Sequence, residues 1–229
     1  METTYRQAPG MMSVGARAEF LRLTYAHLFG AMLLFAGIQY ALFLTGAAEV
    51  IASAMLSVNW LIPLGAFMVV SWFASRAAHR AESKAAQYAA LIGFVAAEAI
   101  IFVPLLYIAA FTIGPSVISS AAWVTILGFA VLTGIVFVTG KDFSFLNSLL
   151  KWGLGLALVG IVASVFLGFE LGTWFSVAMI GLAGAAILRD TSNILLHYPE
   201  DRYVAASLEL FASVALMFWY VLRLFMSRD

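Results

Sequence analysis

Long apolar segments separated by short polar ones dominate the chain. A transmembrane helix needs about 20 apolar residues, because an α-helix rises about 1.5 Å per residue and the hydrocarbon core of a bilayer is about 30 Å thick. Seven segments fit that length, and they are roughly 24–45, 58–75, 86–111, 117–140, 148–169, 172–188 and 203–225. The pattern predicts an all-α membrane protein with seven transmembrane helices; six helices, with one merged segment, are the alternative.

Small residues recur within and between these segments. The connection between the fifth and sixth segments is little more than Glu170, Leu171 and Gly172, so these two helices are expected to form a hairpin. Gly153, and a run of glycine and alanine over 181–186, are expected to let helix backbones approach closely in lipid.

Lysine and arginine occur in every second polar segment between the predicted spans. They occur in the N-terminal segment, in the second, fourth and sixth loops and at the C-terminus, and they are Arg6, Arg17, Arg22, Arg76, Arg80, Lys84, Lys141, Lys151, Arg189, Arg202, Arg223 and Arg228. Because short cytoplasmic loops retain positive charge, the alternation predicts seven spans and a cytoplasmic N-terminal segment, residues 1–20. Arg223 and Arg228 disagree with the outer side that seven spans give the C-terminus. Either the other basic residues determine the topology despite these two, or the last segment does not cross the membrane fully.

Composition excludes several functional classes. Hydrophobic residues make up 64% of the 229 residues and charged residues only 10%, against about 25% charged in an average soluble domain. Twelve basic residues balance twelve acidic ones, so charge gives no reason to expect a nucleic-acid partner. The absence of cysteine excludes disulfides and thiolate chemistry. No phosphate-binding glycine loop, metalloprotease motif or intramembrane protease constellation is found. We therefore expect neither an enzyme nor a bound cofactor.

Acidic residues inside the predicted spans are the first candidates for function. A charged side chain at the centre of a membrane helix costs about 2.5–3.5 kcal/mol, so such residues are rarely incidental. Glu98 lies midway through the third span; it either faces an internal cavity, where it binds a cation or carries a proton, or is protonated and hydrogen-bonded to a neighbouring helix. Glu209 precedes Ser213 by four residues in the last span, so both are expected on one helix face that lines a cavity.

Asp190 and the three histidines have more than one interpretation. Asp190 is expected to close the sixth span, and two alternatives to a functional role are an aqueous loop or the N-cap of a short helix towards His197. His27 is expected to be a hydrogen-bonded histidine near the interface, with proton transfer as the alternative. His79 and His197 are expected to be solvated loop residues, with pH sensing as the alternative.

Several stretches together resemble a known family. The segments 20–28 and 132–137, and above all 187–194 followed by His197 and Tyr203, resemble the Bax inhibitor family, also called the transmembrane Bax inhibitor motif family, and especially its bacterial branch. The resemblance covers nearly the whole chain. It implies a multi-pass protein of the bacterial inner membrane in which the last helix is surrounded by the other six.

The resemblance also implies roles for particular residues. In several members, to which a pH-sensitive calcium leak is attributed, two aspartates at the end of the sixth helix and in the seventh share a proton and gate the pore. Asp190 matches the first aspartate, but the second position falls on Ser213, which cannot ionise; Glu209, one turn away, is the candidate replacement. An arginine of the second helix pairs with the first aspartate in these relatives, and Arg76 is the candidate here.

Two hypotheses of function follow. The first is a pH-sensitive leak for calcium or another cation, or a proton-coupled exchanger, with Glu98, Asp190 and Glu209 along the path. The last two are then candidate oxygen ligands for Ca²⁺. The alternative is a non-conducting partner that regulates a membrane-anchored AAA protease or stress survival, because Ser213 stands where the gating aspartate is expected. Besides the lipid bilayer, the expected partner is then a membrane-bound protease or another membrane protein.

Overall fold

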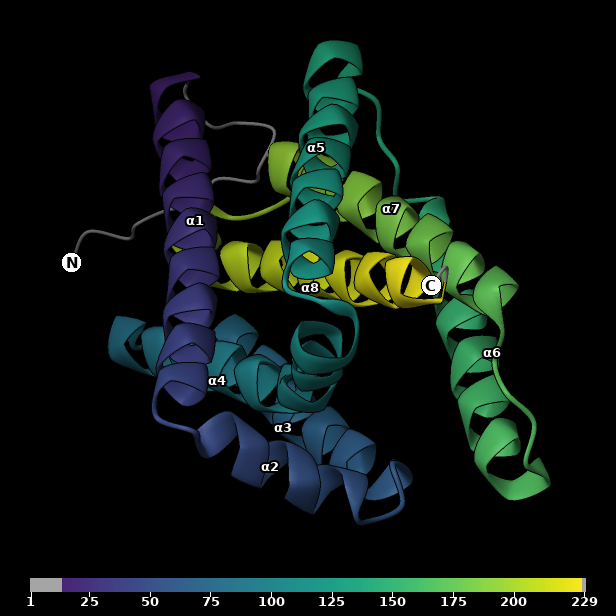
Figure 1. Ribbon diagram of the computed structural model, residues 1–229. Helices are drawn as coiled ribbons and strands as arrows, with labels where there is room; N and C mark the ends of the chain where they lie inside the picture. The colour runs from purple at the N-terminus through teal and green to yellow at the C-terminus, as the bar shows by residue number, and fades with distance from the viewer. Residues whose placement is uncertain (1–13, 228–229) are drawn as a thin grey trace.

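The computed structural model describes residues 14–227, and the secondary structure of this part of the chain consists of helices joined by short loops, without a strand. Seven of its helices are long and apolar enough to cross a bilayer (Figure 1). They are α1 (Val14–Leu44), α3 (Leu61–Arg80), α4 (Lys84–Ile108), α5 (Ser116–Thr139), α6 (Leu146–Leu167), α7 (Thr173–Leu196) and α8 (Tyr203–Met226). The prediction of seven spans is confirmed, and the six-helix alternative is wrong.

Three helices extend beyond the predicted spans at polar ends. α1 begins at Val14 rather than near residue 24, α3 continues to Arg80, and α7 continues to Leu196. Hydropathy misses these ends because they are polar: Glu19, Arg22 and Arg80 are exposed at the ends of α1 and α3, whereas Asp190 of α7 is buried. Residues 1–13 of the predicted N-terminal segment, including Arg6, lie outside the described residues, as does Arg228.

Three shorter elements connect the spans. α2 (Ala47–Leu56) follows Gly46, whose left-handed φ of 76° suits a residue without a side chain. A π-helical turn, Ala109–Ile113, extends α4, and a single 3₁₀ turn, Glu200–Arg202, leads into α8. α2 packs Ala48 and Ala52 against α4, but at ten residues it is too short to cross a bilayer.

The last helix, α8, is the most buried of the seven spans. It packs against α1, α3, α4, α5 and α7, and in Figure 1 it runs through the middle of the bundle behind α1 and α5. A helix that is apolar over most of its surface is suited to such a position, and α8 turns its polar residues Glu209 and Ser213 towards the cavity described below. α6 packs chiefly against α7 at the edge of the bundle. The expectation that all six helices surround α8 is therefore not confirmed for α6.

α6 and α7 form the predicted hairpin. α6 ends at Leu167, followed by Gly168 in a left-handed conformation with φ 70°, and α7 begins at Thr173. Gly153 of α6 faces Leu182 of α7 so closely that a Cβ atom on residue 153 would lie 2.5 Å from the leucine Cδ2. The small residue at this position lets the two helices approach, as expected for packing in lipid.

Candidate functional site

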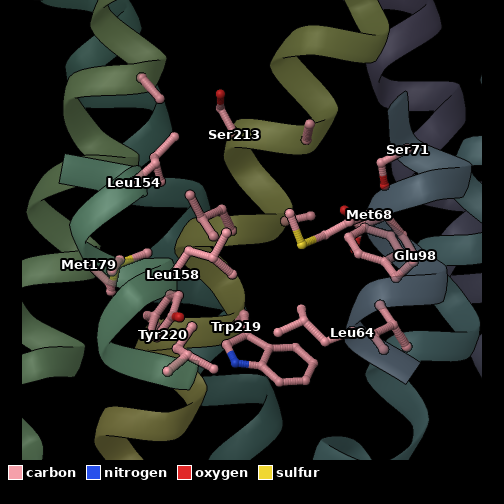
Figure 2. A pocket seen from close by; sticks show the side chains of 18 of the residues that line it. Leu64, Met68, Ser71, Glu98, Leu154, Leu158, Met179, Ser213, Trp219 and Tyr220 are labelled. Carbon is pink, nitrogen blue, oxygen red and sulfur yellow. The ribbon is translucent and has the colours of Figure 1, made fainter. Parts of the chain in front are cut away.

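A cavity of about 970 Å³ lies among α3, α4, α6, α7 and α8. Its middle is lined mostly by apolar side chains from these helices (Figure 2). Its first end, which we call the basic end, lies where α3 and α7 finish and α4, α6 and α8 begin, beside the loops rich in lysine and arginine. The second end is lined by Glu170 and Arg223. All three acidic residues singled out in the sequence, Glu98, Asp190 and Glu209, line this one cavity.

Asp190 has a partner for each of its carboxylate oxygens. Its side chain is 5% exposed. Ser213 of α8 donates a hydrogen bond from Oγ to Asp190 Oδ2 at 2.6 Å. The neighbouring Arg189 donates from its Nη1 to Asp190 Oδ1, also at 2.6 Å. Charge-assisted hydrogen bonds of this length are among the stronger ones in proteins. The position matching the family's second aspartate therefore does face Asp190, but it supplies a hydroxyl donor.

Asp190 lies inside α7, about two turns before its end. The two alternatives to a functional role, an aqueous loop and an N-cap, are both wrong, because α7 continues through the polar residues to Leu196. Ser192 donates to the carbonyl of Arg189 and accepts a hydrogen bond from the backbone N–H of Phe143. The guanidinium of Arg17 from α1 donates to the carbonyl of Ile194 at 2.6 Å. These bonds satisfy polar groups that would otherwise favour a loop.

Glu209 is held by His79. Glu209 Oε1 lies 2.9 Å from His79 Nε2, and Glu209 Oε2 lies 3.7 Å from Arg189 Nη1. Asp190 and Glu209 are thus brought together through a single arginine nitrogen. We call the group Asp190, Ser213, Arg189, Glu209, His79 and Tyr198 the polar cluster.

The hydrogen bonds of His79 define which of its nitrogens exchanges a proton. His79 Nδ1 lies 2.7 Å from the carbonyl of Ser75, which only accepts, so Nδ1 carries the proton. Nε2 faces both Glu209 and the hydroxyl of Tyr198, at 2.8 Å. A protonated Nε2 donates to Glu209, and an unprotonated one accepts from Tyr198. Burial raises the pKa of the Tyr198 hydroxyl above its usual range, which keeps that hydroxyl available as a donor.

The arginine expected to pair with Asp190 was assigned wrongly. Arg76 is exposed, and its guanidinium lies 5.3 Å from the centroid of the Trp72 ring. Arg189 takes that role, while α3 presents His79 to α8 instead. His79 is accordingly not a solvated loop residue but part of the last turn of α3. His197 is exposed outside the helices, 3.4 Å from Asp142, as expected of a loop histidine.

Glu98 stands apart from the polar cluster. It is 7% exposed and faces the cavity from the middle of α4, beside Met68 and Ser71 (Figure 2). Its carboxyl group has no hydrogen bond or ion pair with any of residues 14–227. The bond to a neighbouring helix that the sequence left open is therefore not formed, and the carboxyl group faces the cavity.

His27 is a hydrogen-bonded histidine away from the large cavity. Its Nδ1 lies 2.7 Å from the carbonyl of Leu23, and its Nε2 lies 2.8 Å from the hydroxyl of Tyr88. Its ring packs against that of Tyr203, with centroids 5.0 Å apart. Both nitrogens are occupied within the bundle, which confirms the structural part of the expectation.

The tentative assignment of Asp190 and Glu209 as metal ligands finds no support in the geometry. Among residues 14–227, no three histidine or acidic side chains converge as they would to hold a metal ion. Moreover, the guanidinium of Arg189 lies between the two carboxylates, where it neutralises them and would repel a divalent cation.

A family comparison agrees with this geometry. A sequence model of the family described as "Inhibitor of apoptosis-promoting Bax1" matches residues 17–229. The chain belongs to this family. The match confirms the resemblance to Bax inhibitor proteins, and it covers all seven spans except the first residues of α1.

Individual relatives are bacterial proteins. The chain is 37% identical over 116 residues to "Modulator of FtsH protease YccA" of Escherichia coli K12, over 49% of this chain and 52% of that protein. It is 34% identical over 115 residues to an uncharacterized protein of Pseudomonas aeruginosa, over 49% of this chain and 50% of that one. The chain thus spans about half the length of the curated relatives it matches. An E. coli O6:H1 relative with the same 37% identity is named "Inner membrane protein YccA". Together with the seven apolar helices, these relatives support a multi-pass inner-membrane location.

Proposed function

We propose that this protein is a non-catalytic regulator of a membrane-anchored protease. The observation that carries the proposal is the partner of Asp190, a serine hydroxyl rather than a second carboxylate, in a chain similar to a named modulator of the FtsH protease. Two adjacent carboxylates share a proton because like charges repel, and that sharing makes a pH latch. Ser213 cannot ionise and so adds no negative charge beside Asp190, and Arg189 lies between Asp190 and the nearby carboxylate of Glu209.

The polar cluster acts as a cross-link between helices. Arg189 joins Asp190 and Glu209, and its Nε also donates to Asn147 of α6 at 2.8 Å. Side chains from α3, α6, α7 and α8 are tied together in this way near the basic end. Removing one member of a buried ion pair costs about 3–5 kcal/mol, because the other charge is left without a partner. A fixed arrangement at this end suits a protein that offers a defined surface to a partner.

Reconstitution with the protease tests the proposal directly. The full chain and an FtsH-type protease are placed together in proteoliposomes, and the degradation rate of a membrane-protein substrate is measured with and without the chain. We expect the rate to change at least about twofold and the two proteins to copurify. An unchanged rate, together with no copurification, would overturn the proposal.

Glu209→Gln provides a variant that separates regulation from ion transport. A glutamine oxygen still accepts the hydrogen bond from His79 but carries no charge, so regulation is expected to persist. Any flux that depends on the Glu209 charge is expected to fall. Parallel flux and proteolysis measurements on one protein preparation make the comparison direct.

A cation leak or proton-coupled exchanger is the second candidate. It is favoured by one observation, the cavity of about 970 Å³ that Glu98, Asp190 and Glu209 all line. The test is calcium flux into proteoliposomes between about pH 6 and about pH 8, the range in which histidine titrates. Wild type is compared with Asp190→Asn and Glu209→Gln. Absence of calcium flux in wild type across this range would eliminate a calcium leak.

A further inference from the structure

The middle of the cavity holds a carboxyl group that no other described residue neutralises. Glu98 is 7% exposed and has neither a hydrogen bond nor an ion pair within residues 14–227. It lies about 21 Å along the helix axis from Lys84, near the midpoint of the 30-residue span Lys84–Ile113. An ionisable residue at this depth is costly and is a functional candidate by default.

The other charged groups along the cavity lie at its two ends. These groups are Asp190, Glu209, Arg189 and Lys151 at the basic end and Glu170 and Arg223 at the opposite end. Arg189 is engaged with both acidic residues of the polar cluster, and Arg223 donates a hydrogen bond to the carbonyl of Leu171 at 2.8 Å. No arginine or lysine of residues 14–227 forms an ion pair with Glu98, so its carboxyl group is accessible to a cation that enters the cavity.

The wall of the cavity is rich in aromatic and thioether side chains. The side chains that contribute these groups are Phe67, Met68, Phe94, Phe102, Met179 and Trp219. Trp219 stacks on Trp60 with ring centroids 5.9 Å apart and meets Phe102 edge-on at 4.9 Å. Aromatic faces attract cations through their quadrupoles, and methionine side chains adapt to ligands of different shape. Figure 2 shows Glu98 and Met68 on one side of the cavity, with Leu154 and Leu158 opposite and Trp219 below.

We propose that this cavity binds a lipophilic organic cation, an aromatic phosphonium or a hydrophobic quaternary ammonium, with Glu98 as its counter-ion. The volume of about 970 Å³ is near the upper end of the range of about 300–1,000 Å³ typical of small-molecule sites. Calcium requires about six to eight oxygen ligands, whereas the middle of the cavity is lined mostly by apolar side chains. A weakly hydrated cation with a hydrocarbon surface matches the carboxylate and the apolar wall together. This site is independent of protease regulation.

Binding of tetraphenylphosphonium to the purified full chain in detergent tests the proposal. The free and bound probe are separated by equilibrium dialysis, and fluorescence of Trp60 and Trp219, which line the cavity, reports occupancy at the site. Triphenylphosphine oxide serves as the neutral aromatic analogue. Wild type is expected to bind the cation saturably and at least about tenfold more tightly than the neutral compound, because the carboxylate of Glu98 attracts a cation and not a neutral molecule.

Variants locate the charge preference. Glu98→Gln is expected to weaken tetraphenylphosphonium binding at least about tenfold and to leave the neutral compound within about twofold. Glu98→Asp, which keeps the charge, is expected to restore most of the preference. The matched control is Glu49→Gln, an exposed acid on α2 outside the cavity, which is expected to bind as wild type does.

Three results would overturn the proposal. The first is no saturable binding to wild type, and the second is equal affinity of wild type for the charged and neutral compounds. The third is a Glu98→Gln variant that elutes as a single species and binds the cation as tightly as wild type. The first two use the unaltered protein, so they decide the question even if Glu98→Gln does not fold. Occupation of the cavity by a tightly bound lipid or a partner helix would exclude both compounds and appear as the first result.

Discussion

Replacing Ser213 with alanine tests whether the hydroxyl bond to Asp190 stabilises the bundle. The substitution removes one oxygen and leaves the volume of the side chain nearly unchanged, so packing should be preserved. It deprives Asp190 Oδ2 of a donor at 2.6 Å and leaves Arg189 as the remaining partner of the carboxylate. A hydrogen bond to a charged group contributes about 1.5–3 kcal/mol. Ser213 lines the cavity, where water can enter and replace part of the bond, so we expect the lower end, about 1.5 kcal/mol.

The control is a buried serine on the same helix. Ser207 is 0% exposed, and its hydroxyl donates to the carbonyl of Val204, a bond within the helix itself. Ser207→Ala should lower the free energy of unfolding by about 0.5 kcal/mol, since no charged group loses a partner. Both variants are unfolded reversibly by raising the fraction of SDS in mixed micelles, and tryptophan fluorescence follows the transition. A loss of about 1.5 kcal/mol lowers the folding equilibrium constant about tenfold, which this assay resolves.

The result that refutes the reasoning is equal stability of the Ser213 and Ser207 variants. A double-mutant cycle adds a second criterion, because an interaction between two residues shows as non-additivity. In an Asp190→Asn background the Ser213→Ala substitution should cost less than in wild type, since the charge that strengthened the bond is gone. Additive effects would mean that Ser213 stabilises the helix by some route other than Asp190.

Two further predictions concern the α6–α7 hairpin and the loop before it. Gly153→Leu should destabilise the protein by about 1–3 kcal/mol through overpacking, since a Cβ at this position would lie 2.5 Å from Leu182. Gly155→Leu is the control, because a Cβ at Gly155 meets nothing within 4 Å. Equal thermal stability of the two variants would contradict the prediction. The backbone N–H of Ser144 bonds to the Asp142 carboxylate at 2.8 Å and lowers the pKa of Asp142. A carboxyl ¹³C titration should therefore give a midpoint below the value of about 3.9 for free aspartate. The stabilisation that the ionised Asp142 carboxylate gives the folded state is present above the pKa of Asp142 in the unfolded chain, and it is lost as pH falls through the pKa in the folded protein. A midpoint at or above the free value would rule out the hydrogen bond from Ser144.

The helix count was predictable because lipid constrains length and composition strongly. Each span must satisfy its backbone internally and stay apolar for about 20 residues, so hydropathy and charge alternation report it. α2 escaped this argument because ten residues are too few to span a bilayer. The full length of α7 was also missed, because a charged residue such as Asp190 normally marks the end of an apolar span unless its buried partners are known.

The candidate site was predictable only where one helix or the family resemblance defined it. Glu209 and Ser213 lie one turn apart, so their shared face follows from helix geometry alone. The apposition of Ser213 and Asp190 came from the resemblance. His79 and Tyr198 join the polar cluster through the rotation of α3 and the path of the loop before α8, which depend on packing between helices. A single sequence records none of those rotations, and Arg76 was chosen over Arg189 for the same reason.

The position of α8 affects the order in which the bundle is completed during synthesis. α8 follows every other described helix in the chain, yet it fills the space against which five of them pack. Before α8 enters the membrane, Asp190 of α7 lacks its hydrogen bond from Ser213, and His79 of α3 lacks its contact with Glu209. We therefore expect the nascent bundle to stay incompletely packed at the position of α8 until that helix enters the membrane.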